Sequence, residues 1–120
     1  VARQTVLLEA ARHLDAKPEY REATLDAVNH LFGRNPYGRS FVTGLGNDPP
    51  RFPHDRRSAA DDLDVAWPGY LIGGPHPEAT DWHDQQDDYR TNEIAINWNG
   101  ALIYALAACL DHEPIRAAER

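Results

Sequence analysis

The stretch WHDQQDDYRTNEIAINWNG, residues 82–100, decides how the rest of the chain is arranged. It begins with a polar, acid-rich segment and ends in an apolar run that continues to Leu110. Asn92 is a favourable N-cap residue, so the pattern predicts a helix from there, with Glu93 in its first turn. A carboxylate at the mouth of an apolar helix, near other carboxylates, suits general acid–base chemistry. Glutamate is also common in a first turn because it complements the helix dipole, so the spacing alone leaves both interpretations open.

Two amphipathic helices are predicted upstream of this stretch. Apolar residues recur at three- and four-residue spacing over residues 2–14 and again over residues 19–32. Pro18 is well placed to open the second helix, and Gly33 to end it in a left-handed conformation. We expect both helices to contribute to the core and neither to carry a catalytic residue. The predicted core stripes are Val6, Leu7, Ala10, Ala11 and Leu14 in the first helix and Leu25, Val28, Leu31 and Phe32 in the second.

Loops are predicted over residues 34–91, because glycine and proline recur through most of this region. Only residues 40–43 and 69–72 have the character of short strands. An irregular region of this length within a compact domain is usually either functional or disordered. Large apolar side chains such as Phe41 and Trp67 argue against disorder. Ordered loops that line a site are therefore expected.

Composition limits the classes of function that fit. The chain has 120 residues, the size of one small domain or of part of a larger one. Its formal net charge of -7 argues against a nucleic-acid partner, and its longest apolar run, residues 101–110, is too short to span a membrane. Cys109 is the single cysteine, so no disulfide forms within the chain. The sequence from Val1 onward has no signal-peptide pattern, and its residues predict no compartment.

Several segments resemble glycoside hydrolase family 9, the inverting cellulases. Residues 33–56, GRNPYGRSFVTGLGNDPPRFPHDR, are similar to that family's loop ending in Pro-His-x-Arg, although Asp55 stands where the family has a second histidine. Residues 68–75, PGYLIGGP, resemble its Pro-Gly-x-x-x-Gly-Gly-Pro turn. Residues 82–100 match a third pattern of aromatic, acidic, small and amide residues at fixed spacing. The residues in register with it are Trp82, Asp84, Tyr89, Glu93, Ala95 and Asn99.

The resemblance implies an all-α fold, namely the C-terminal helices and long active-site loops of an (α/α)6 barrel. Residues 1–33 would supply two helices, residues 34–91 the loops of the cleft, and residues 92–111 a buried final barrel helix. The implied activity is hydrolysis of β-1,4-glucosidic bonds in cellulose and related β-glucans, with inversion. In the family the catalytic base lies in an upstream Asp-x-Gly-Asp motif, which this chain lacks. The 120-residue chain is therefore expected to be inactive without the N-terminal remainder of the catalytic domain.

Site residues follow from the resemblance by position. Glu93 would be the general acid that protonates the leaving glycosidic oxygen, and Asp84 would support the catalytic centre. His54, in the same catalytic set, and Arg56 would contact the sugar next to the scissile bond. Tyr89 would pack against the face of a glucosyl unit.

A general acid has to hold its proton near neutral pH, and desolvation or a nearby like charge favours the protonated form. We expect Trp98 and Tyr89 to supply the burial and Asp84 the like charge. An inverting enzyme also needs its acid and base about 6.5–9.5 Å apart, with room for a water between them.

No cofactor is implied for the chemistry, and Asp61 and Asp64 are candidate oxygen ligands for a structural calcium ion. The expected partners are a β-1,4-glucan substrate and the rest of the catalytic domain, with no nucleic acid and no membrane. The family implies a secreted, extracellular protein. The alternative is a non-catalytic carbohydrate-binding or structural remnant of such a domain, although such a remnant has no need for the complete set of site residues.

Overall fold

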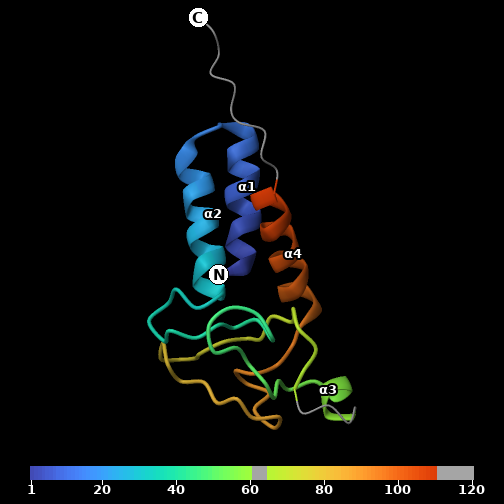
Figure 1. Cartoon of the computed structure of the whole chain (residues 1–120). Coiled ribbons are helices and arrows are strands. Elements are labelled where there is room, and N and C mark those ends of the chain that lie inside the picture. Colours follow the sequence, from blue (N-terminus) through green and yellow to red (C-terminus); the bar gives the residue numbers. More distant parts are fainter. Residues whose placement is uncertain (61–64, 111–120) are drawn as a thin grey trace, which may run out of the picture.

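The computed structural model describes residues 1–60 and 65–110, in which three long helices stand on a layer of loops (Figure 1). Helix α1 is Ala2–Leu14, α2 is Pro18–Leu31 and α4 is Ile96–Leu110. A five-residue helix, α3, Arg56–Ala60, lies at the edge of the loop layer. Helices α1 and α2 form an antiparallel pair, and α4 packs against both of them.

Helix α1 has the bounds that the sequence predicts, but its predicted core stripe is wrong. The α1 residues that face the other two helices include Thr5 and Glu9, which are fully buried. Leu7 and Leu14, which belong to the predicted stripe, are exposed. Small or hydrogen-bonding side chains therefore form the contact with α2 and α4. The larger apolar side chains point to a side on which no other described residue covers them.

Glu9 shows how a carboxylate is accommodated between these helices. The residue is 1% exposed, and its two carboxylate oxygens accept hydrogen bonds from the Thr24 hydroxyl at 2.9 Å and from Nε of Arg12 at 2.7 Å. A buried charge is tolerated only when it is paired and hydrogen-bonded, and both conditions are met here. Glu9 therefore joins α1 to α2.

Helix α2 agrees more closely with the prediction. It starts at Pro18, its Leu31 is buried, and Gly33 follows with a φ of +119°, a conformation that favours glycine. Leu25, however, is exposed, and Thr24 occupies the buried face instead.

Helix α4 begins later than predicted, and Asn92 is not its N-cap. Its first helical residue is Ile96, and the amides of Trp98 and Asn99 donate to the carbonyl of Ala95. The side chain of Asn92 instead forms hydrogen bonds with residues of the loops. The helix is also less buried than predicted for residues 92–111. Three apolar residues at seven-residue spacing, Ile96, Ile103 and Leu110, are exposed.

The loop layer is held together by isolated β-bridges, without a named strand in the described residues. Residues 40–43 and 69–72, the two predicted strands, do pair with each other. Val42 and Leu71 form an antiparallel bridge, and the flanking amide of Thr43 donates to the carbonyl of Tyr70 at 2.9 Å. Each segment is too short to extend this pairing into a sheet.

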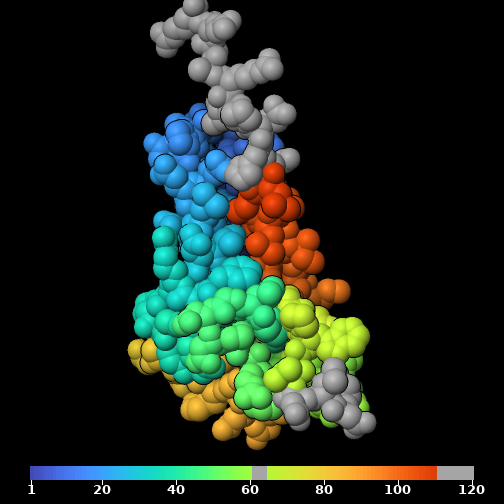
Figure 2. Space-filling model, viewed as in Figure 1, coloured from blue at the N-terminus to red at the C-terminus, as the bar shows by residue number. Residues whose placement is uncertain are grey.

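The core continues from the helices into the loops. Phe41 and Trp82 are buried and meet edge to face, with ring centroids 6.5 Å apart. The backbone turns closely around them: Gly46 has a φ of +80°, and a Cβ there would lie 2.5 Å from the carbonyl oxygen of Phe32. Figure 2 shows the loop segments packed against the lower end of the helices. The loops are thus ordered, as their apolar content predicts.

Within the described ranges, each helix is too short or too polar to cross a membrane.

Candidate active site

Glu93 lies in a short extended segment between two other pieces of backbone. On one side the amide of Gly73 donates to the carbonyl of Glu93 at 3.0 Å, and Ile72 forms an antiparallel bridge with Ile94. On the other side Glu93 forms a parallel bridge with His54, whose amide donates to the carbonyl of Asn92 at 2.8 Å. The backbone at Glu93 is therefore fixed by contacts that are distant in sequence, and not by a helical turn.

This pairing brings two predicted site residues together. Residues paired across a β-bridge direct their side chains to the same face, whereas successive residues in an extended segment alternate. Glu93 and His54 consequently share one face of the loop layer, while Asn92 points into the core. The carboxylate of Glu93 is exposed, and among the described residues it has no hydrogen-bond or ion-pair partner.

The imidazole of His54 has a defined orientation. Its Nδ1 lies 2.7 Å from the carbonyl oxygen of Gln86. Because a carbonyl oxygen can only accept a hydrogen bond, Nδ1 carries a proton, and Nε2 of the neutral ring is left as an acceptor. The side chain of Gln86 also donates to the carbonyl of Asp55 at 3.0 Å. Gln86 therefore holds both the ring and the backbone of this loop, a role that its sequence pattern does not indicate.

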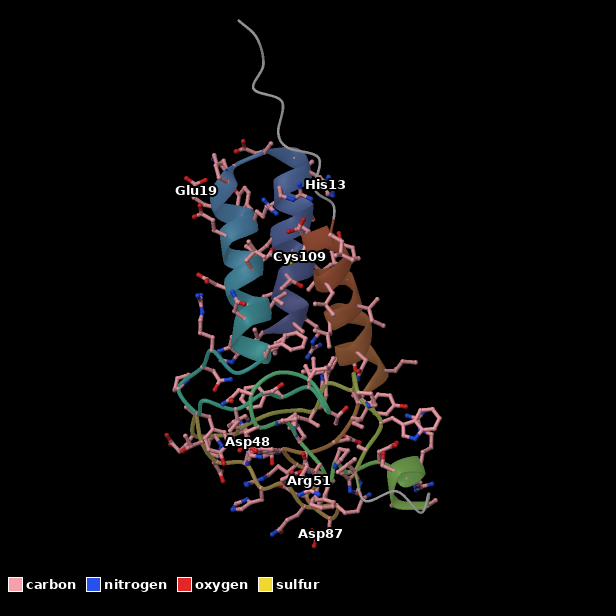
Figure 3. All side chains as sticks on the ribbon, viewed as in Figure 1. His13, Glu19, Asp48, Arg51, Asp87 and Cys109 are labelled. Atoms are coloured by element: carbon pink, nitrogen blue, oxygen red, sulfur yellow. The ribbon has the colours of Figure 1, made fainter. Side chains whose placement is uncertain are left out.

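Asp84 is fully engaged with backbone groups. Its Oδ2 accepts from the amide of Arg51 at 2.8 Å, and its Oδ1 from the amide of Phe52 at 2.9 Å. Hydrogen bonds to an ionised acceptor are among the stronger ones in proteins. In Figure 3, Arg51 lies in the loop layer, at the end of the molecule opposite to His13 and Glu19. Asp84 thus anchors the start of the loop that carries His54.

Asn92 lies at the centre of this loop layer, in a position other than the helix cap that its sequence predicts. It is 0% exposed, and its side chain contacts three separate residues. Oδ1 accepts from the indole N–H of Trp82 at 2.9 Å, and Nδ2 donates to the carbonyls of Phe52 at 2.8 Å and Gln85 at 3.1 Å. An amide beside a predicted catalytic glutamate is the only signal the sequence offers, and it equally suits the helix cap that we predicted.

Tyr89 and Arg56 occupy the same end of the molecule as His54. Tyr89 is 70% exposed, and its ring centroid lies 6.3 Å from that of His54 in an edge-on arrangement. Arg56 is the first residue of α3 and is exposed. Its guanidinium has no hydrogen-bond or ion-pair partner in the described part of the chain. Both side chains are therefore available to a ligand.

Two neighbouring carboxylates have structural roles. Hydrogen bonds from the hydroxyl and amide of Thr91 hold the pKa of Asp88 below its ordinary value, against a smaller effect of burial. Burial raises the pKa of Asp55, but hydrogen bonds from Ser58 and the charge of Arg57 outweigh it, so the net pKa is lowered. Asp55 caps α3 through these bonds. Neither group has the raised pKa that suits a proton donor near neutral pH.

The predicted shielding of Glu93 is not found within the described residues. Trp98 is half-buried over Gly73, where an added Cβ would lie 3.3 Å from its ring, and Tyr89 lies beside His54. Glu93 remains open to solvent. The segment that carries Glu93 is extended, and its side chain alternates with that of the buried Asn92, so it faces outward.

A hollow of about 400 Å³ lies elsewhere, between the start of α1, the end of α2 and residues 71–75. His30 and Trp98 are among its lining residues, but none of the predicted site residues is. It is therefore distinct from the face that carries Glu93 and His54.

The calcium candidates Asp61 and Asp64 lie outside the described residues. Across the ranges that are described, no three His, Cys, Asp or Glu side chains converge in a way that could hold a metal ion.

Known proteins resemble this chain both in sequence and in structure. Endoglucanase D of Acetivibrio thermocellus is 57% identical over 112 residues, which cover 93% of this chain and 18% of the relative. A family 9 glycoside hydrolase structure from Bacteroides ovatus aligns with a TM-score of 0.84 and 42% identity, over 92% of this chain and 20% of that one. The structure of AaCel9A in complex with cellobiose-like isofagomine aligns with a TM-score of 0.85 and 33% identity, over 92% of this chain and 24% of that one.

The chain thus spans less than a fifth of the length of the curated relative with 57% identity. Its helices and loops have the fold of one part of the (α/α)6-barrel enzymes that it superposes on. The model of the glycosyl hydrolase family 9 matches residues 1–106. The chain belongs to glycosyl hydrolase family 9.

Proposed function

We propose that this chain forms part of an inverting β-1,4-glucanase, in which Glu93 is the general acid. The observation that carries the proposal is the bridge between His54 and Glu93, which gives a carboxylate and an imidazole one common, solvent-facing surface. The family supports hydrolysis of cellulose or a related β-glucan, since the relative with 57% identity is an endoglucanase. The ligand in the AaCel9A structure, a cellobiose-like isofagomine, supports a β-linked glucosyl substrate.

In this mechanism Glu93 donates its proton to the glycosidic oxygen as the bond to the anomeric carbon breaks. A water molecule attacks that carbon from the opposite face, and a base takes the water's proton. The base comes from a part of the enzyme outside these 120 residues and has to lie about 6.5–9.5 Å from the carboxyl group of Glu93. Substrate and the remaining part of the domain would supply the desolvation that Glu93 lacks here.

The surrounding residues would bind the sugar on the leaving-group side. Nε2 of His54 can accept a hydrogen bond from a sugar hydroxyl, because Nδ1 is already committed to Gln86. Arg56 offers a planar fork of donors to neighbouring hydroxyls. Tyr89 offers an exposed aromatic face, to which the apolar face of a glucosyl ring can pack. Asp84 supports the contacts of His54 and Arg56 indirectly, by anchoring their loop at Arg51 and Phe52.

The stereochemistry of the product tests this proposal. The full-length enzyme would be mixed with a soluble cello-oligosaccharide, and the anomeric proton of the new reducing end followed by NMR before mutarotation. We expect the α-anomer to form first from the β-linked substrate. Initial formation of the β-anomer would contradict inversion. Oligosaccharide binding without any hydrolysis would favour a carbohydrate-binding remnant instead.

Two further features belong to the proposal. We place the enzyme outside the cell, because a polymeric glucan has to be cut before its products can enter. Calcium binding by Asp61 and Asp64 is the remaining sequence prediction, for which a calorimetric titration of the Asp61→Asn/Asp64→Asn double variant against the native enzyme is the direct test.

A further inference from the structure

The amide of Asn92 has one orientation that its neighbours permit. The indole N–H of Trp82 can only donate, so it requires Oδ1. The carbonyls of Phe52 and Gln85 can only accept, so they require the two hydrogens of Nδ2. Aspartate has no such hydrogens, and glutamine is longer by one methylene. The position therefore specifies asparagine by its hydrogen bonds, not by helix capping.

The backbone of Asn92 joins the same segments. Its carbonyl accepts from the amide of His54 at 2.8 Å, and its amide donates to the carbonyl of Asp88 at 3.0 Å. Asn92 therefore holds residues 52 and 54 of one loop and residues 85 and 88 of another, next to Glu93. Because side chains alternate in an extended segment, the inward anchoring of Asn92 turns the side chain of Glu93 outward.

We propose that Asn92 is a positioning residue that sets the placement of Glu93 relative to His54, so that the acid meets the leaving oxygen of a sugar bound by His54. The inference rests on the proposed role of Glu93 as general acid. Asn92 touches neither substrate nor the reacting atoms, and it acts through the backbone that it fixes. Misplacement of a reacting group by about 1 Å can cost roughly 10²-fold in rate. Loss of the hydrogen bonds of Asn92 should therefore slow the hydrolysis of substrates that need proton donation more than that of substrates that do not.

The test uses Asn92→Asp in the full-length enzyme and a series of aryl β-cellobiosides that differ in the acidity of the leaving phenol. The variant keeps the size of the side chain and the acceptor for Trp82, but directs an oxygen at the carbonyls of Phe52 and Gln85. A substrate with a poor leaving group needs the acid, and we expect kcat on it to fall by about 10²-fold. A dinitrophenyl leaving group needs little protonation, and its loss should stay within about threefold.

Asn99→Asp is the matched control. Asn99 is a half-buried asparagine, whose Oδ1 accepts from the amide of Leu71 at 2.9 Å and whose Nδ2 donates to the carbonyls of Leu71 and Ala95. It stabilises the loop layer without contacting the segments that carry His54 or Asp84. We expect any loss of activity in this variant to be equal across the substrate series, because a smaller fraction of folded enzyme lowers the rate on every substrate by the same factor.

A second variant covers the case in which Asn92→Asp does not fold. Trp82→Phe leaves the amide of Asn92 in place but removes the indole donor, so it should give a smaller loss with the same dependence on the leaving group. A loss that is uniform across the series in the foldable variant, or no loss at all, would overturn the positioning role. Glu93→Gln in the same series separates the two proposals. If Glu93→Gln shows no dependence on the leaving group, the proposed function fails. If Glu93→Gln shows the dependence and the variants that alter the hydrogen bonds of Asn92 do not, only the role of Asn92 fails.

Discussion

Replacement of Asp84 by asparagine would test how the loop that carries His54 is held. Both carboxylate oxygens accept backbone amides, from Arg51 at 2.8 Å and from Phe52 at 2.9 Å. Asparagine keeps the shape but has one acceptor oxygen, so one amide would face an NH2 group. Hydrogen bonds to a charged partner contribute about 1.5–3 kcal/mol each, and a neutral one about 0.5–1.5 kcal/mol.

Loss of one charged bond and weakening of the other should cost about 2–4 kcal/mol of loop docking. At 1.4 kcal/mol for each factor of ten, the docking equilibrium constant falls by roughly 30- to 1,000-fold. Activity follows the fraction of enzyme molecules in which the loop is docked, and this fraction falls less than the equilibrium constant does. We therefore expect kcat/KM on a soluble cellulose derivative to drop by about 10- to 100-fold.

Hydrogen exchange provides an independent measurement of the same event. The amides of Arg51 and Phe52 should exchange faster in Asp84→Asn, by up to the same factor as the docking constant. Asp87→Asn is the matched control, because Asp87 is exposed in the same region of the loop layer (Figure 3) and its carboxylate has no hydrogen-bond partner among the described residues. Equal exchange and equal kinetics in the two variants would refute the anchoring role of Asp84.

Three other predictions follow from the site and its surroundings. His54→Ala and Arg56→Lys should each lower kcat as well as kcat/KM, by roughly 10- to 100-fold for a lost hydrogen bond to a charged or polarised partner; unchanged kinetics in both would place this loop outside the cleft. Because hydrogen bonds from Thr91 lower the pKa of Asp88, its stabilising contribution is complete above the ordinary value of 3.8 and is lost as the pH falls through the lower folded value. Thermal melts of Asp88→Asn should therefore be less sensitive to acid below about pH 4 than those of the native protein, and equal sensitivity would argue against this role. The 120-residue chain alone should be inactive and self-associate through the exposed apolar side of α4, as light scattering would show; a cooperatively folded monomer that cleaves β-glucan would disprove this.

Local sequence patterns predicted the bounds of α1 and α2 but not which of their faces are buried. Three- and four-residue spacing sufficed for α1, Ala2–Leu14, because the period of apolar residues is a local property. The buried side of α1 carries Thr5 and Glu9, whose burial depends on partners in α2 and on close packing of the helices. The exposed leucines, Leu7 and Leu14, satisfy the pattern equally well in a chain that corresponds to one part of a larger barrel. Periodicity therefore cannot tell the two faces apart.

The site shows a similar division. The resemblance to the family predicts Glu93 and His54 as site residues, but nothing in the spacing of two residues 39 positions apart indicates that they pair across a β-bridge. Asn92 was predicted as a helix cap because asparagine is favoured there and an apolar run follows. Its side chain instead hydrogen-bonds to Trp82, Phe52 and Gln85, and the helix starts at Ile96. Non-local hydrogen bonds outweighed a local preference in this case.

The central claim, that Glu93 donates the proton, is tested most directly by Glu93→Gln in the full-length enzyme. Glutamine keeps the hydrogen-bonding shape of the protonated acid but cannot donate a proton to the leaving oxygen. We predict that the rate of cellulose hydrolysis falls by about 10²–10⁴-fold, while the affinity for a cello-oligosaccharide measured by calorimetry is retained. Hydrolysis of cellulose at close to the native rate by Glu93→Gln would contradict the assignment.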